Sequence, residues 1–148
     1  MVTTDMQDDL RTWLGAKLNW LLPENTYCIG QLKNNLIIGA VGFTHHINKS
    51  ILIHSAGLDK TWVSRELLRA VFEYPFNHLG CNILIGQVGS KNYAAKRFND
   101  HLGFKTVAVI KDAHENGDLV IMTMSKDKCK YLGNFKKEER DECDTLMV

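Results

Sequence analysis

Histidine is the residue of this sequence best suited to proton transfer near neutral pH. His54 follows a short run of branched residues, and its imidazole could accept a substrate proton because an unperturbed histidine titrates close to neutrality. The same position also suits a hydrogen-bonded strand histidine at the edge of the core. His45 and His46 are adjacent, and neighbouring residues of an extended chain point in opposite directions, so they are a poor pair of metal ligands. The sequence predicts a candidate base and no metal site.

The four cysteines carry no signal for a metal site or a disulfide framework. Cys28, Cys81, Cys129 and Cys143 lie far apart, and none forms a Cys-x-x-Cys pair. We expect them to be reduced thiols.

Composition indicates one ordinary globular domain. The chain has 148 residues, 45% of them hydrophobic, and a formal net charge of +1. So small a charge provides no overall field for nucleic acid or an anionic membrane, and the lysines near the C-terminus alternate with acidic residues. No run approaches eighteen apolar residues, and residues 1–9 are acidic where a signal peptide would be basic. A cytoplasmic protein is expected, and neither membrane nor nucleic-acid binding.

The first half of the chain predicts a helix followed by an antiparallel meander. Thr4 and Gln7 have the spacing of a capping box, and leucines recur at helical spacing from Leu10 to Leu21, before Pro23. Branched and aromatic residues then favour three strands, at residues 27–32, 36–43 and 50–54. A tight turn at residues 33–35 and a looser turn at residues 45–49 connect them.

The second half predicts two helices that alternate with strands. A helix over residues 67–79, kinked near Pro75, precedes a buried strand at residues 82–88. A second helix over residues 90–101 is capped by Ser90 and is expected to turn inward the side chains of Tyr93, Ala94, Arg97, Phe98 and Leu102. Two last strands, at residues 104–110 and 119–124, meet at a hairpin turn containing Asn116-Gly117.

This order of elements predicts an α+β fold. The sheet is mixed and mostly antiparallel, with one parallel β-α-β crossover and flanking helices. A single domain is expected over residues 1–125, and residues 126–148 are expected to form a charged surface tail.

Two runs at the ends of the last helix resemble the signature of the Gcn5-related N-acetyltransferase family. They are Asn92-Tyr93-Ala94-Ala95 at its start and His101-Leu102-Gly103-Phe104 at its end. The resemblance covers roughly residues 27–124. More narrowly, Trp62-Val63-Ser64-Arg65, Tyr74-Pro75-Phe76 and Leu79-Gly80-Cys81 resemble small acetyltransferase-like proteins encoded by bacteriophages, which implies the host cytoplasm as location.

The resemblance implies transfer of an acetyl group from acetyl-CoA, as cosubstrate, to an amine. The amine attacks directly in a ternary complex, so neither a metal nor a covalent enzyme intermediate is needed. In the family, two neighbouring strands part and the pantetheine arm lies between them. Here those strands would end near His54 and begin near Asn82, which puts His54 where many members carry a base.

The resemblance also implies a cofactor site around the helix that follows the parted strand. In the family a glycine-rich loop there binds the pyrophosphate, but here no glycine lies between Gly57 and Gly80. The helix terminus remains, with Thr61 or Ser64 as its cap. The predicted cofactor-binding residues are Ser55, Ala56, Gly57, Lys60, Trp62, Val63, Ser64, Arg65, Asn92 and Ala95.

A proton donor for the departing thiolate is harder to identify. Many members carry a tyrosine where this chain has Phe98 and Asn99, so Ser90, Tyr93 or a water is left as donor. Ser90 could instead be only a helix cap and Tyr93 only a core aromatic. Asn92 would contact the pantetheine arm, or would simply begin the helix.

Two functions therefore stand side by side. The first is an N-acetyltransferase, whose acyl acceptor would be an unidentified small molecule or protein that meets Trp13, Lys17, Trp20 and the His45-His46 turn. The alternative is a binding protein of the same fold that has lost catalysis and acts as an accessory factor of a phage or its host. The closing hairpin could pair with a second copy to form a homodimer.

Overall fold

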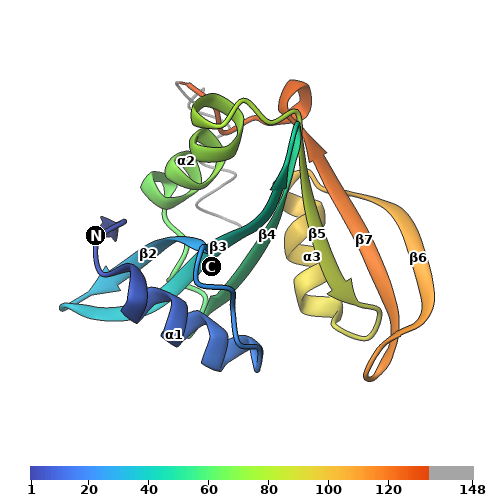
Figure 1. The fold of residues 1–148 in the computed structure, drawn as a ribbon, viewed down its shortest axis with the longest axis horizontal. Helices are drawn as coiled ribbons and strands as arrows, with labels where there is room; N and C mark the ends of the chain where they lie inside the picture. The colour runs from blue at the N-terminus through green and yellow to red at the C-terminus, as the bar shows by residue number, and fades with distance from the viewer. Residues whose placement is uncertain (134–148) are drawn as a thin grey trace.

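A seven-stranded mixed sheet, in the order β1-β2-β3-β4-β5-β7-β6, forms the centre of the protein (Figure 1). The computed structural model describes residues 1–133. Only β4 and β5 pair in parallel, through a crossover that contains α2, and all other neighbours are antiparallel. The predicted mixed sheet with one crossover is confirmed. The strands are β1 (Val2–Thr3), β2 (Tyr27–Lys33), β3 (Leu36–Ile47), β4 (Ser50–Gly57), β5 (Ile83–Gly89), β6 (Lys105–His114) and β7 (Gly117–Ser125).

Helices cover both faces of the sheet. They are α1 (Gln7–Leu18), α2 (Arg65–Glu73), which continues into the π-helical turn η1 (Tyr74–His78), α3 (Tyr93–Leu102) and the short 3-10 helix η2 (Lys126–Lys128). Successive strand residues point to opposite faces, so Ala40 of β3 belongs to the cluster with Leu10 and Leu14 of α1. Val41 belongs to the larger cluster with Leu67 of α2. No helix within residues 1–133 is long and apolar enough to cross a membrane.

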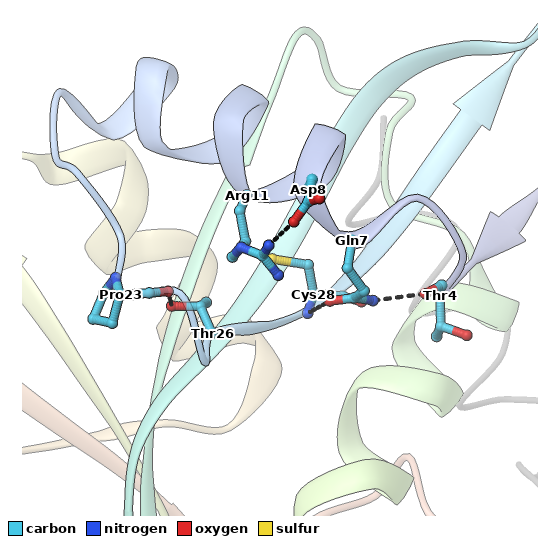
Figure 2. A network of polar contacts seen from close by, with 7 residues as sticks. All are labelled: Thr4, Gln7, Asp8, Arg11, Pro23, Thr26 and Cys28. Atoms are coloured by element: carbon cyan, nitrogen blue, oxygen red, sulfur yellow. Dashed lines mark hydrogen bonds and ion pairs between the residues drawn. The ribbon is translucent and has the colours of Figure 1, made fainter.

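Helix α1 is attached to the sheet through Gln7, as Figure 2 shows. The Gln7 amide donates to the carbonyl oxygens of Thr4 and Cys28, at 2.7 and 2.8 Å, and accepts from the Cys28 N–H at 2.9 Å. The predicted capping box is therefore wrong. Met6 occupies the cap position with a left-handed φ of 55° and no side-chain cap, because the Gln7 side chain is engaged by β2.

Helix α1 also ends earlier than predicted. Asn19 terminates it with a left-handed φ of 53°, four residues before Pro23. Trp20 is therefore outside the helix, and Leu21, predicted on its apolar face, is 94% exposed. Arg11 pairs with Asp8 one turn earlier in α1, and the Thr26 hydroxyl donates to the Pro23 carbonyl oxygen in the segment that leads to β2 (Figure 2).

Asparagines with a left-handed φ form the tight turn between β2 and β3. Asn34 and Asn35 have φ values of 53° and 62°, which confirms the tight turn. Strand β3 extends to Ile47, so His45 and His46 belong to the strand end and not to a loop as expected. A register shift between Thr44 and Ile47 accommodates them.

The last helix has a different cap from the one predicted, and its predicted inward face is confirmed only at Phe98 and Leu102. Asn92, not Ser90, caps α3, and its side-chain oxygen accepts from the Ala95 N–H at 3.2 Å. The helix therefore starts at Tyr93, and its covered side chains are Ala95, Phe98, Asn99 and Leu102. Tyr93, Ala94 and Arg97 are exposed instead.

The packed part of the chain continues past residue 125. Tyr131 is fully buried and stacks on Phe72 of α2, with ring centroids 5.0 Å apart. Within the predicted surface tail, Lys126, Asp127 and Lys128 are exposed, whereas Tyr131 belongs to the core. The remainder of the predicted tail, residues 134–148, lies outside the described residues.

Candidate active site between β4 and β5

The sheet opens between its two parallel strands. Their pairing comprises three residue pairs: Ser50 with Ile83, Ile51 with Leu84, and Leu52 with Ile85. Beyond these, β4 remains paired with β3 and β5 with β7, so the two strands diverge toward their C-terminal ends (Figure 1). A cavity of about 660 Å³ lies at this opening. The strands part beside His54, where the family resemblance implied it.

Side chains from both faces of the sheet line the cavity. Lys17 and Leu18 contribute from the end of α1 and Trp20 from the segment after it, and Val41, Leu67 and Phe72 contribute from the opposite face. On the far side the lining consists of β5 residues 86–89 and of Asn92, Ala95, Phe98 and Asn99 from the start and inner face of α3. Ligand pockets of this size and mixed character accommodate a small molecule or the arm of a cofactor.

Trp62 forms one wall of this cavity. Gly39 and Gly57 face each other across β3 and β4, and a Cβ added to either would lie 2.2 or 2.1 Å from the indole. The indole therefore packs against the bare main chain of these two glycines, which is possible only because both lack a side chain. Trp62 lines the opening without filling it.

Ser64 caps the start of α2, and neither Ser64 nor Arg65 lines the cavity. The Ser64 hydroxyl accepts from the Leu67 N–H at 3.0 Å and donates to the Gln31 side-chain oxygen at 2.9 Å. Asp59 accepts from the N–H and hydroxyl of Thr61, at 2.7 and 2.5 Å, and these bonds hold the pKa of its carboxyl below the ordinary value. Asp59 thus turns toward Thr61.

The predicted cofactor-binding residues are divided by the structure. Those that line the cavity are Ser55, Trp62, Val63, Asn92 and Ala95. Those that do not line it are Ala56, Gly57, Lys60, Ser64 and Arg65.

His54 lies in the cavity wall with one ring nitrogen already engaged. Its Nε2 lies 2.7 Å from the Thr44 hydroxyl, and the Trp20 indole meets the ring edge-on at 5.0 Å between centroids. Burial, and secondarily the charge on His45, lowers the pKa of His54 from 6.5 to about 4. The imidazole is therefore neutral near pH 7, as a proton acceptor must be.

The two predicted proton donors do not line the cavity. The Ser90 hydroxyl accepts from the Asp118 N–H at 3.1 Å and so holds the β6–β7 hairpin. Tyr93 is 67% exposed, with the Lys96 ammonium 5.9 Å from its ring.

Sequence reasoning missed Thr44 and His114. Thr44 is buried in β3, and nothing in the local sequence indicates that it contacts His54, ten residues away. His114 ends β6 and lines the cavity, and a Cβ on Gly89 would lie 2.7 Å from its ring. The Asn116-Gly117 turn signal could have placed His114 beside β7, but not beside β5. No group of three or more His, Cys, Asp or Glu side chains within residues 1–133 could hold a metal ion.

Solved structures with the same architecture are numerous, although no family model matches the chain and no curated protein matches its sequence. A spermidine N-acetyltransferase from Vibrio cholerae, in complex with CoA and spermine, is 14% identical with a TM-score of 0.69, over 86% of this chain and 96% of that one. A ribosomal-protein-alanine N-acetyltransferase from Brucella melitensis is 13% identical with a TM-score of 0.66, over 84% and 99%. A structure from Salmonella typhimurium that holds its cofactor acetyl-CoA is 13% identical with a TM-score of 0.61, over 84% and 92%. At such identities the likeness concerns architecture, and the chain has the fold of the Gcn5-related N-acetyltransferases.

Proposed function

We propose that this protein transfers an acetyl group from acetyl-CoA to an amine. The observation that carries the proposal is the parting of β4 and β5 into a cavity of about 660 Å³. On the side toward β5, the main chain of residues 53–57 has no strand partner. A pantetheine arm contains two amides, so it can bond to this free edge as a short added strand would. Structures of the same fold that hold CoA or acetyl-CoA support this use of the opening.

Three side chains of the cavity suit the transfer step. His54 is neutral and accepts the proton that the amine loses as it attacks the thioester carbon. Asn92 has its side-chain oxygen committed to capping α3, which leaves its amide N–H groups for a pantetheine carbonyl. Ser55 lines the cavity one residue after His54 and can donate to the same arm. The CoA thiolate is stable enough at neutral pH to leave without a strong acid.

The phosphates would lie at the start of α2. The dipole of this helix favours an anion at its N-terminal end. Lys60 and Arg65 add positive charge, while Asp59 is turned onto Thr61. In this arrangement charged side chains replace the glycine-rich loop that the sequence lacks.

The alternative is a binding protein of the same fold without transfer activity. It is favoured by the composition of the cavity, because the lining residues within 1–133 include no tyrosine, cysteine, aspartate or glutamate. A bacteriophage origin, a host-cytoplasm location and pairing with a second copy remain predictions of the sequence.

The first test of both proposed functions, the acetyltransferase and the binding protein, is whether acetyl-CoA binds. At about a hundred times its dissociation constant a ligand stabilises by about 2.7 kcal/mol, which for this size raises the melting temperature by roughly 5–10 °C. Gly86→Leu should abolish the shift, because residue 86 lines the cavity and a Cβ there meets no atom closer than 3.9 Å. Val107→Leu, on exposed β6, is the matched control.

Transfer itself is measured as free CoA thiol released when amines are added. Thiol release that depends on an amine, and that Gly86→Leu abolishes, supports the enzyme. A thermal shift without release from any amine favours the binding protein. No shift at millimolar acetyl-CoA would refute the use of the opening by this cofactor.

A further inference from the structure

A chain of hydrogen bonds leads from the cavity to the protein surface. The Thr44 hydroxyl lies 2.7 Å from His54 Nε2 and 2.8 Å from His45 Nδ1. Thr44 is only 5% exposed, whereas His54 lines the cavity and His45 is exposed at the end of β3. One buried hydroxyl thus connects an imidazole in the cavity with an imidazole in solvent.

The backbone holds His45 in an unusual conformation at this place. Its φ is 54°, in the left-handed region that residues other than glycine rarely adopt. The register shift between Thr44 and Ile47 begins here. Without that irregularity, adjacent strand residues would point to opposite faces, and His45 could not bond the hydroxyl of the residue before it.

A hydroxyl has one proton, so these two hydrogen bonds can run in two directions. In the first, His54 Nε2–H donates to Thr44 and Thr44 donates to His45 Nδ1, which leaves the lone pair of His54 Nδ1 unused. In the second, His45 Nδ1–H donates to Thr44 and Thr44 donates to His54 Nε2. Within residues 1–133 no hydrogen bond is made by His54 Nδ1.

We propose that Thr44 and His45 relay the proton of the acceptor amine from His54 to solvent, a role that rests on the proposed acetyl transfer. As the nitrogen–carbon bond forms, His54 Nδ1 takes the proton of the amine. His54 Nε2 gives its proton to the Thr44 oxygen, Thr44 gives its own proton to His45 Nδ1, and His45 Nε2–H releases a proton to water. The hydrogen bonds then have the second direction. They return to the first when His45 Nε2 takes a proton from water and His54 Nδ1 gives its proton to the departing CoA thiolate, so the cycle ends with the amide and the CoA thiol.

The surroundings of His54 favour passing the proton on over storing it. Burial and the charge of His45 lower the pKa of His54 to about 4, so an added proton is held weakly. The other titratable groups that line the cavity are Lys17, from the end of α1, and His114, from β6. Neither is an anion, and no carboxylate of residues 1–133 lines the cavity to stabilise an imidazolium.

Three variants test the relay, with one matched control. Thr44→Val removes the hydroxyl at nearly constant shape, Thr44→Ser restores it, and His45→Gln removes the last imidazole. His78→Gln is the control, because His78 is exposed in η1, does not line the cavity and takes no part in this chain of hydrogen bonds.

We expect Thr44→Val and His45→Gln to lower kcat on the order of 10- to 100-fold, with the KM for acetyl-CoA unchanged. Thr44→Ser and His78→Gln should keep kcat within about twofold, and added imidazole buffer should restore part of the rate to His45→Gln. Wild-type kcat in His45→Gln or in Thr44→Val would overturn the relay.

Nitrogen NMR of the histidine rings keeps the relay testable apart from catalysis. In the resting protein we expect His54 as the Nε2–H tautomer, with Thr44→Val removing this preference and His78→Gln leaving it intact. A resting His54 protonated on Nδ1 would overturn the proposed direction. If no amine is acetylated, the proposed function fails. The tautomer measurement still decides whether the hydrogen bonds between His54, Thr44 and His45 are formed.

Discussion

Acid should destabilise this protein through His54 in particular. The pKa of His54 is lowered from 6.5 to about 4 in the folded state, chiefly by burial. Between these two values the unfolded chain binds a proton on this side chain and the folded protein does not. Stability from the neutral imidazole is therefore present above pH 6.5 and is lost as the pH falls toward 4.

The size of the loss follows from the two pKa values. One pKa unit corresponds to about 1.4 kcal/mol, and integrating the proton uptake between pH 7 and pH 5 gives about 2 kcal/mol for this residue. The cavity beside His54 admits water, so this figure is the upper end of the expected range.

Comparison with His54→Gln isolates the contribution of one residue from all other titrations. We expect the free energy of unfolding, measured by urea titration, to fall more steeply in the wild type than in His54→Gln, by up to about 2 kcal/mol between pH 7 and pH 5. His46→Gln removes an exposed histidine and should follow the wild type. Parallel pH curves for the wild type and His54→Gln would refute the argument that burial keeps this imidazole neutral.

Three further substitutions test the cavity wall, the end of the chain and the phosphate site. Gly57→Ala should cost about 1–3 kcal/mol of stability and shift the fluorescence of Trp62, because its Cβ would lie 2.1 Å from the indole. Tyr131→Ala should lower the free energy of unfolding, measured by urea titration, by about 3–5 kcal/mol, since this side chain is fully buried. Lys60→Ala combined with Arg65→Ala should raise the dissociation constant for CoA and weaken its dependence on salt.

Each of these substitutions has a control on the same protein. Gly86→Ala adds a Cβ that meets no atom closer than 3.9 Å, so equal losses in Gly86→Ala and Gly57→Ala would argue against the contact with the indole. Tyr93→Ala removes an exposed ring and should be nearly neutral. Lys105→Ala with Lys111→Ala removes two exposed charges on β6, and an equal effect on CoA binding would remove the phosphate role from the start of α2.

Much of the fold was predictable because its signals are local. The alternation of branched residues identified β2 to β7, and Asn34-Asn35 identified a tight turn because asparagine tolerates a left-handed φ. Strand β1 has two residues and no pattern of its own, so it was missed. Of the predicted inward face of α3, Phe98 and Leu102 are confirmed, whereas Tyr93, Ala94 and Arg97 are exposed, and the cap is Asn92 and not Ser90.

The sequence by itself determined the order of the elements and the parallel crossover, because these follow from short-range propensity and chain connectivity. The opening in the sheet beside His54 was implied by the resemblance to the acetyltransferase family. Only the tertiary structure decided that the Gln7 side chain bonds β2 in place of capping α1 with Thr4, and that Tyr131 enters the core. It also decided that Thr44 connects His54 to His45. Each of these contacts depends on strand register and on a few ångströms of side-chain placement between distant or irregular segments, which local sequence patterns do not encode.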